Sequence, residues 1–391
     1  MPNRHVSLKP GKEKPIRNRH HWIFSGAIAY MPENVNGECL QVLSSTGEKL
    51  GWGYFNHKTK ISGRMLSFDE TPAEESLYTS LEAALAMRRC LFDHTITNAY
   101  RLVNGEGDLL PGLVVDRYND VLVIQISTLG MKKLRHLIVE YLTRQLSPRS
   151  IYEKSLLPSR KEEGLMDEQG TLYGEIPSGN VEILENGHLF YVSILHGQKT
   201  GFFLDHREMR NQIGSLAKNK RVLNCFAYTG GFSVYAAAAG AGGVDSVDIS
   251  AASMQMGERN MELNRLSSVN HHFYTADVFE FLREQPLDYE LVILDPPAFA
   301  KRQKDVIAAC RGYKDINRIA IEKMPKGSTL LTSSCSYHVD EELFQTVVFQ
   351  AAVEAKRVVK IIGRHRIGAD HPINICHPES DYLKSLLLYI E

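Results

Sequence analysis

The sequence lacks several features that would place it in a specialised class of proteins. No apolar run approaches the ~20 residues that a membrane-spanning helix needs. The basic start of the chain is not followed by the apolar stretch of a signal peptide. We therefore expect a cytoplasmic protein that does not act at a membrane. Charge of one sign is also missing: the net charge is -1, so any surface that binds nucleic acid must be local.

Paired cysteines are absent as well. The chain has no Cys-x-x-Cys pair, and its six cysteines are scattered: Cys39, Cys90, Cys225, Cys310, Cys335 and Cys376. This spacing argues against a zinc site and against a disulfide framework, and it favours reduced, mostly buried thiols. We expect no bound metal, and we interpret Cys90 and Cys225 as core residues.

The patterns that are present predict three domains, since 391 residues are too many for one ordinary domain. Residues 1–72 contain short alternating runs with glycine breaks, which favour a small β-barrel. Residues 73–180 begin with a helical period and continue with strands and a second helix, which indicates an α+β domain. Residues 181–391 alternate strands and helices, which is typical of a parallel sheet covered on both faces. Its last runs, VVKIIGR and YLKSLLLYI, are predicted to be edge strands.

A cofactor site is predicted where the first strands of this sheet end. Gly230 and Gly231 follow the strand VLNCF and let the backbone approach a ligand at a helix amino terminus. Asp248 ends the second strand, where a carboxylate can hold ribose hydroxyls, and Asp277 follows the third, where it could bind an adenine amine. Each feature alone also fits a tight turn or a helix cap. Their order favours S-adenosylmethionine over a nicotinamide cofactor.

A catalytic pair is predicted at the next two strand ends. Asp295 ends a hydrophobic strand and is followed by Pro296 and Pro297, which stiffen the loop. Cys335 ends the following strand in a serine-rich setting, although a lone cysteine is also often core filling. Adjacent parallel strands lie about 5 Å apart, so both groups could face one substrate. A thiolate that adds to carbon 6 of cytosine activates carbon 5 for methylation, and Asp295 could bind the ring nitrogen.

These motifs resemble the bacterial large-subunit ribosomal RNA cytosine-5 methyltransferases that carry an amino-terminal PUA domain. HHWIFSGAI is similar to the PUA opening and LLPGLVVDRYNDVLVIQ to the middle EEHEE-type domain. QKTGFFLDHREMR, NCFAYTGGFS, DPPAFAK and SSCSYHV are similar to the methyltransferase motifs. The resemblance implies an α/β class I (Rossmann-like) methyltransferase domain after a β-barrel and an α+β domain. It also implies S-adenosylmethionine, a Cys335 nucleophile and a 23S ribosomal RNA partner, free or partly assembled.

The resemblance further implies which residues contact the cofactor. These residues are Lys199, Thr200, Phe202, Asp205, Arg207, Phe226, Tyr228, Thr229, Gly230, Gly231, Asp248, Ile249, Asp277, Val278 and Asp295. One departure concerns Ala298, which stands where many related enzymes have a second cysteine. Product release therefore has no assigned residue, and neither has the base that removes the carbon-5 proton.

RNA contacts are predicted at the strand-end loops and at basic segments. Phe299 could stack on an extruded base, and Pro296, Pro297 and Lys301 are expected to face substrate. Phosphates could be bound by the basic residues 1–21 and by Arg160, Lys161, Lys301, Arg302 and Lys304. Such charges also fit a solvated face, and a homodimer is compatible with the sequence.

Two other functions stay open. The Asp-Pro-Pro string also occurs in enzymes that methylate exocyclic amines without a cysteine, which makes non-covalent base methylation the alternative. An RNA-binding or ribosome-assembly module with an inactive methyltransferase fold is a third hypothesis, which the glycine turn and the strand-end acids disfavour.

Overall fold

The computed structural model describes residues 4–391, and these form two compact units. The first unit holds Leu184 and the described residues before it, together with Val192–Leu204 and Ala369–Ser380. The second unit holds Glu185–Tyr191, Asp205–Gly368 and Asp381–Glu391. Three segments of the predicted last domain, 181–184, Val192–Leu204 and Ala369–Ser380, therefore belong to the first unit. No helix in residues 4–391 is both long and apolar enough to span a membrane.

The first unit opens with a six-stranded sheet in the order β2-β6-β5-β4-β1-β3. Alternate side chains along β1 and β4 are buried, and Val6, Val42 and Met65 are among the residues that form the core of this sheet. The elements are β1 (His5–Leu8), α1 (Lys14–Arg17), β2 (Trp22–Phe24), β3 (Ile28–Tyr30), β4 (Cys39–Leu43), β5 (Lys49–Phe55) and β6 (Ile61–Ser67).

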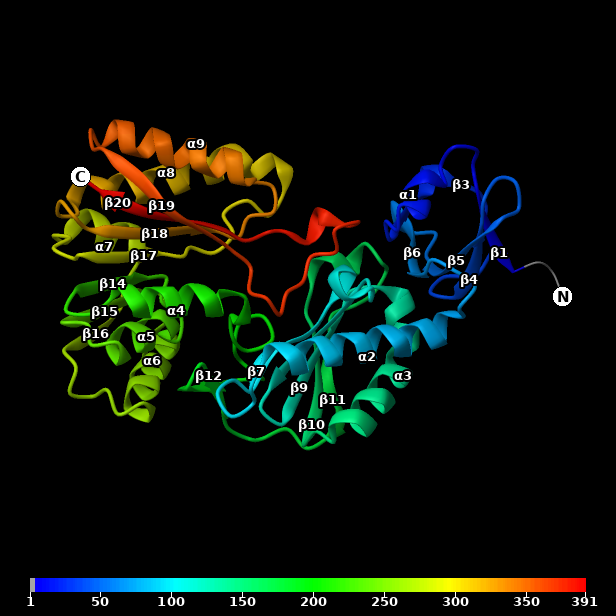
Figure 1. Ribbon diagram of the computed structural model, residues 1–391, viewed down its shortest axis with the longest axis horizontal. Helices are drawn as coiled ribbons and strands as arrows, with labels where there is room; N and C mark the ends of the chain where they lie inside the picture. Colours follow the sequence, from blue (N-terminus) through cyan, green and yellow to red (C-terminus); the bar gives the residue numbers. More distant parts are fainter. Residues whose placement is uncertain (1–3) are drawn as a thin grey trace. The chain divides into compact units, whose positions relative to one another are not determined.

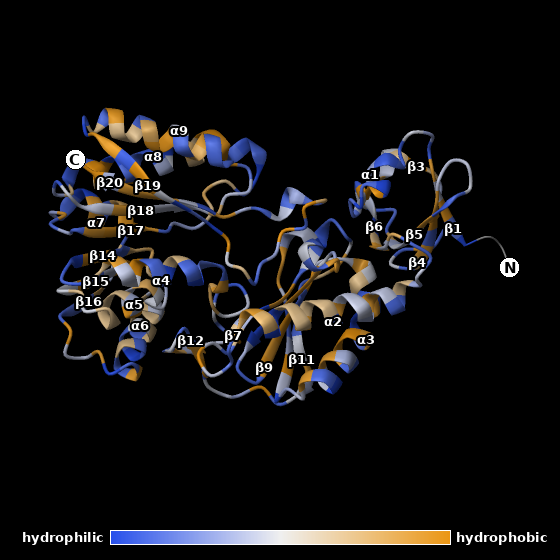
Figure 2. Ribbon diagram, viewed as in Figure 1, coloured by the Kyte–Doolittle hydropathy of each residue, from blue (hydrophilic) through white to orange (hydrophobic). Residues whose placement is uncertain are grey.

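A five-stranded sheet with two long helices follows, in the order β11-β10-β9-β8-β7. Leu81 of the first helix and Ile138 of the second share one hydrophobic core with strand residues such as Val115. Figure 2 shows β9 in hydrophobic colour, while both helices mix the two colours as amphipathic helices do. The elements are α2 (Ala73–Leu91), β7 (Ala99–Asn104), β8 (Leu113–Tyr118), β9 (Val121–Ile126), α3 (Leu129–Leu146), β10 (Ser150–Ser155) and β11 (Glu168–Gly174).

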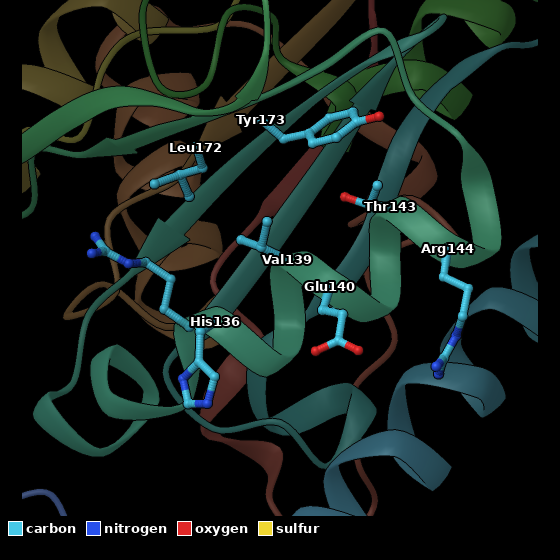
Figure 3. A pocket seen from close by; sticks show the side chains of 8 residues that line it. His136, Val139, Glu140, Thr143, Arg144, Leu172 and Tyr173 are labelled. Atoms are coloured by element: carbon cyan, nitrogen blue, oxygen red, sulfur yellow. The ribbon is translucent and has the colours of Figure 1, made fainter.

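A surface pocket of about 580 Å³ lies between α3 and β11 (Figure 3). Val139 and Leu172 give it apolar walls, and Arg135 and Arg144 lie at its rim. The residues that line this pocket belong to the first unit, whereas the strand-end residues described below belong to the second unit.

Two sequence-based predictions about the first unit are wrong. Arg160 is fully buried, and its guanidinium donates to the carbonyls of Ile126 and Met166 and to the carboxylate of Glu168. It therefore holds the fold together and does not bind RNA phosphates, whereas Lys161 is exposed. Cys90, which we took for a core residue, is exposed near the end of α2.

The second unit contains a seven-stranded sheet in the order β16-β15-β14-β17-β18-β20-β19. Strands β14 to β18 are parallel to one another, and β20 is antiparallel to both β18 and β19. Figure 1 shows helices on both sides of this sheet, with α8 and α9 on the opposite side from α4 and α5. The strand order reverses between β14 and β17, which is where open α/β sheets bind ligands.

The elements of this unit begin in the hairpin that crosses from the first. Its turn uses Asn186 and Gly187, both with positive φ, as a two-residue hairpin requires. The strands are β12 (Val181–Glu185), β13 (His188–Val192), β14 (Arg221–Cys225), β15 (Gly243–Asp248), β16 (His271–Thr275), β17 (Leu291–Leu294), β18 (Thr329–Ser334), β19 (Val359–Arg366) and β20 (Lys384–Ile390). The helices are α4 (Arg207–Leu216), α5 (Gly231–Ala238), α6 (Ala251–Leu263), α7 (Val278–Glu284), α8 (Val306–Lys323) and α9 (Glu341–Glu354).

The prediction of two closing edge strands is half wrong. β19 is an edge strand, but β20 is inserted between β18 and β19, and nearly all of its residues are buried. Its continuous apolar run LLLYI is the pattern of a strand covered on both faces, because an edge or half-exposed strand alternates polar residues.

Candidate active site

The carboxyl ends of parallel strands bring most of the predicted site residues to one edge of the sheet. Asp248 is the last residue of β15, whereas Asp295 and Cys335 directly follow β17 and β18. β17 lies between β14 and β18, with Leu294 paired to Cys225 on one side and to Thr332 on the other. The sheet therefore places the predicted cofactor and catalytic residues at neighbouring strand ends.

The loop after β14 has a strained backbone. Phe226 and Tyr228 have positive φ values of 59° and 47°, and Gly230 has a φ of 76°. A Cβ at Gly230 would lie 3.3 Å from the Phe273 ring, so the position needs glycine for space as well as for conformation. Non-glycine residues with positive φ cost of order 1–3 kcal/mol each, and such strain gathers at ligand sites. The buried Thr229 is held by a bond from Asn260 to its carbonyl.

Asp248 is fixed by the two loops beside it. Its carboxylate accepts hydrogen bonds from the backbone N–H of Tyr228 (3.0 Å) and of Ser250 (2.9 Å). The next residue, Ile249, has 73% of its surface exposed, so its side chain is open to a ligand. A fixed carboxylate beside an exposed apolar side chain fits a nucleoside, whose ribose hydroxyls donate to the acid and whose base packs on the apolar group.

Asp277 caps a helix in this structure. Its Oδ1 accepts from the N–H groups of Phe279 (2.8 Å) and Glu280 (3.1 Å) at the start of α7. The cap was one of the two interpretations that the sequence left open, and it fixes the position of the carboxylate without using Oδ2. The side chain of Val278 is buried in the core, so only its backbone can meet a ligand.

The predicted string before the sheet is divided between the two units. Thr200 and Phe202 lie in the first unit, where the hydroxyl of Tyr118 contacts the Thr200 hydroxyl (2.7 Å) and accepts from the N–H of Phe202 (3.1 Å). The Thr200 hydroxyl also donates to Asp116 (2.6 Å). Lys199 is exposed in the same segment. The assignment of these residues to the cofactor stays a prediction.

Asp205 and Arg207 belong to the second unit. The carboxylate of Asp205 accepts from the Tyr382 hydroxyl (2.5 Å), which joins this turn to the segment before β20. Arg207 is buried, and its Nε lies 3.7 Å from the carboxylate of Glu185. Arg210 makes a two-bond ion pair with the same Glu185, so this carboxylate anchors α4 in the unit.

Asp295 has a partner that the sequence analysis missed. The Nδ1 atom of His206 lies 3.2 Å from a carboxylate oxygen of Asp295. The His206 side chain is 3% exposed and that of Asp295 is 19% exposed, so the pair is nearly buried but open on the acid side. His206 stands between Asp205 and Arg207 in the predicted string, and only the density of polar residues there signalled it.

The loops that carry Asp295 and Cys335 are joined by Ser336. Its hydroxyl accepts from the N–H of Ala300 (3.1 Å) and contacts the hydroxyl of Tyr313 (2.9 Å) on α8. The thiol of Cys335 lies 3.8 Å from the carbonyl of Pro296, to which it can donate. The thiol and the Asp-Pro-Pro backbone are therefore within contact of each other.

Three of the other thiols are poor nucleophiles, one of them buried and two partly exposed. Burial raises the pKa of Cys39 to about 12 and raises the pKa values of Cys225 and Cys310, so these thiols stay protonated near neutral pH. Cys335 is partly exposed at the strand end. It therefore has the access that a nucleophile needs.

The predicted substrate-facing residues differ in exposure. Pro297 and Lys301 are exposed, whereas Pro296 is buried. The ring of Phe299 lies 4.6 Å from that of Tyr313 and 5.9 Å from that of Phe279, between centroids, so it helps to hold this loop. Two further predicted phosphate contacts are also exposed, namely Arg302 and Lys304.

Comparisons with known proteins agree with this geometry. Residues 167–361 match the family described as S-adenosylmethionine-dependent methyltransferase, and residues 6–68 match the PUA-like domain family. The chain is 41% identical to ribosomal RNA large subunit methyltransferase I of Shewanella denitrificans and 42% identical to that of Tolumonas auensis. Each match covers 98% of both proteins.

Solved structures extend the likeness to three dimensions. A SAM-dependent methyltransferase from Streptococcus mutans is 25% identical with a TM-score of 0.82, and a methyltransferase complexed with SAH is 26% identical with a TM-score of 0.85. Both matches cover 98% of this chain and 99% of the other. The predicted fold class and cofactor are thereby confirmed. The chain belongs to the ribosomal RNA large subunit methyltransferase I family and is an S-adenosylmethionine-dependent methyltransferase.

Proposed function

We propose that this enzyme methylates carbon 5 of a cytosine in large-subunit ribosomal RNA and that Cys335 is its nucleophile. The RNA substrate is supported by full-length relatives that carry that name and by the PUA-like match. The observation that carries the cytosine chemistry is the position of Cys335. It is a partly exposed thiol directly after β18, in contact with the loop that begins at Asp295.

The proposed mechanism begins with the thiolate of Cys335. Its sulfur forms a bond to carbon 6 of the cytosine, and the ring electrons shift so that carbon 5 becomes nucleophilic. Bound S-adenosylmethionine supplies the electrophilic methyl group. After transfer, a base takes the carbon-5 proton, the carbon–sulfur bond breaks, and the Cys335 thiolate is restored. Asp295, which His206 contacts at 3.2 Å, would act in its protonated form and donate its proton to the ring nitrogen as negative charge develops there.

The contacts at the cofactor side support a matching division of roles. Asp248, held by two backbone donors, would bind the ribose hydroxyls, and Ile249 would pack on the adenine. Asp277 would meet the adenine amine through the oxygen that does not cap α7. The loop from Phe226 to Gly230, which contains three residues with positive φ, would pass close to the cofactor. Such a close approach needs a tight turn, and Gly230 has no side chain to block it.

The decisive experiment uses large-subunit RNA that contains 5-fluorocytosine, both naked and within partly assembled subunits. Fluorine blocks loss of the carbon-5 proton, so a covalent pathway leaves the enzyme attached to RNA. We expect mass spectrometry to find this complex, linked through Cys335, with wild type and with the control Cys310→Ala. It should be missing with Cys335→Ala. Methyl transfer to ordinary RNA that survives Cys335→Ala would overturn the proposal and favour non-covalent base methylation.

A further inference from the structure

Strand β20 begins with a buried lysine for which the mechanism above has no use. Lys384 is 8% exposed. Its ammonium donates to the carbonyl oxygens of Ser336 (2.7 Å) and Tyr382 (2.9 Å). Among residues 4–391 no carboxylate lies within ion-pair distance of it. Burial of a charge is costly unless the charge is paired, so the position calls for an anion.

The pairing of the strands puts this charge beside Cys335. β20 runs antiparallel to β18, and Lys384 is the partner of Ser334, the last residue of β18. From that position its side chain reaches the carbonyl of Ser336, two residues further along. The lysine side chain therefore extends past Cys335, the residue that separates Ser334 from Ser336.

The surrounding charges agree with this position. Burial lowers the pKa of Lys384, and the neighbouring acidic groups Cys335, Asp381, Asp340 and Glu341 oppose this effect. Glu341 and Asp381 are already paired with Arg366, which lies across from Lys384 on β19. On the side of α8, the facing group is Tyr313, and burial raises the pKa of its hydroxyl.

We propose that Lys384 is the positive charge that holds Cys335 as a thiolate and so readies it for the covalent step. The two carbonyl bonds use two of the three N–H donors of the ammonium, which leaves the third for the sulfur that this proposal pairs with it. The thiol proton leaves to solvent before RNA binds, and Lys384 keeps its own protons. A cation beside a thiol favours the thiolate, as at other reactive cysteines. This inference rests on the proposed function, because only a covalent mechanism needs the thiolate.

The test measures the thiol itself and needs no RNA. The full-length enzyme is alkylated with iodoacetamide from about pH 5 to about pH 10, a range that includes the ordinary thiol pKa of ~8.5, and mass spectrometry follows the peptide with Cys335. Lys384→Gln can still donate to the two carbonyls but carries no charge. Lys384→Arg keeps the charge, and Lys360→Met removes an exposed lysine of β19 as the control. Thermal unfolding identifies variants that fold, with Lys384→Met as a second uncharged variant.

We expect the inflection of the alkylation rate to move to higher pH by about one unit or more in the uncharged variants. It should stay near the wild-type value in Lys384→Arg and Lys360→Met. The acid limb of the methyl-transfer rate should move in parallel, whereas a purely structural loss would lower the rate equally at every pH. An unchanged inflection in a folded Lys384→Gln or Lys384→Met would overturn the proposal.

The outcome is separable from that of the 5-fluorocytosine experiment. A trapped RNA complex with an unchanged alkylation inflection in the uncharged variants would leave the proposed function intact and remove Lys384 from it. A shifted inflection without any trapped complex would keep the lysine–thiolate pair and reject the cytosine chemistry.

Discussion

The sheet edge of the second unit has two halves that hold their functional groups in different ways. In the cofactor half, the loops after β14, β15 and β16, the carboxylates of Asp248 and Asp277 accept hydrogen bonds from backbone N–H groups. In the substrate half, the loops after β17 and β18, the contacts come from side chains. His206 faces Asp295, and Lys384 reaches the strand end beside Cys335.

On the proposed roles of these residues, we expect this difference to separate cofactor binding from chemistry. The backbone N–H groups that donate to Asp248 and Asp277 do not titrate. Imidazole, thiol and ammonium groups change protonation with their surroundings, so the substrate half sets the pH dependence of turnover. The comparison predicts that substitutions in the cofactor half change cofactor affinity and that substitutions in the substrate half change the rate of the chemical step.

The largest effect is expected for Cys335→Ala. Removing the nucleophile should lower turnover by on the order of 10⁴-fold or more, as for other covalent catalysts. The dissociation constant of S-adenosylmethionine, measured by calorimetry, should stay within about twofold because the thiol lies outside the cofactor half. A matching loss of cofactor affinity would break the division between the halves.

The opposite pattern is expected for Asp248→Ala. Loss of a charged hydrogen-bonding group is worth about 1.5–3 kcal/mol, which corresponds to a rise in the cofactor dissociation constant of roughly 10- to 100-fold. Turnover at saturating cofactor should change by only about twofold, since the substrate half is untouched. Asp245→Ala on the same strand is the control, because that carboxylate binds His272 and Tyr289 away from the strand end. A fall in turnover that saturating cofactor does not restore would contradict the prediction.

The cofactor half was largely predictable from sequence because its signals are local. Gly230 and Asp277 each follow a recognisable strand, Asp248 ends one, and Asp295 and Cys335 follow two more. Each could be placed at the sheet edge without knowing which residues lie beside it. Whether the individual residues contact the cofactor or the base stays a prediction.

The partners in the substrate half could not be predicted, because they come from distant parts of the chain. His206 lies in a short turn without periodicity. Lys384 begins the apolar strand β20, and it lies near Cys335 only because β20 is inserted antiparallel beside β18. The same physics explains the errors. Arg160 looked like a surface charge and Cys90 like a core thiol, but burial is decided by the elements that cover a residue.

The smallest effect is expected for the loss of a single hydroxyl group. It tests whether turnover depends on the side-chain contacts that hold the loops of the substrate half. Tyr313→Phe removes the hydroxyl that contacts Ser336, and Tyr289→Phe removes one that donates to Asp245. Both rings are buried. Each loss should lower the free energy of unfolding by about 0.5–1.5 kcal/mol in denaturant titrations. Only Tyr313→Phe should also lower turnover, by roughly two- to tenfold, because Ser336 joins the loops of Asp295 and Cys335. Equal turnover in the two variants would mean that this hydroxyl stabilises the fold alone. The halves would then differ in their titrating groups and not in how tightly their loops are held.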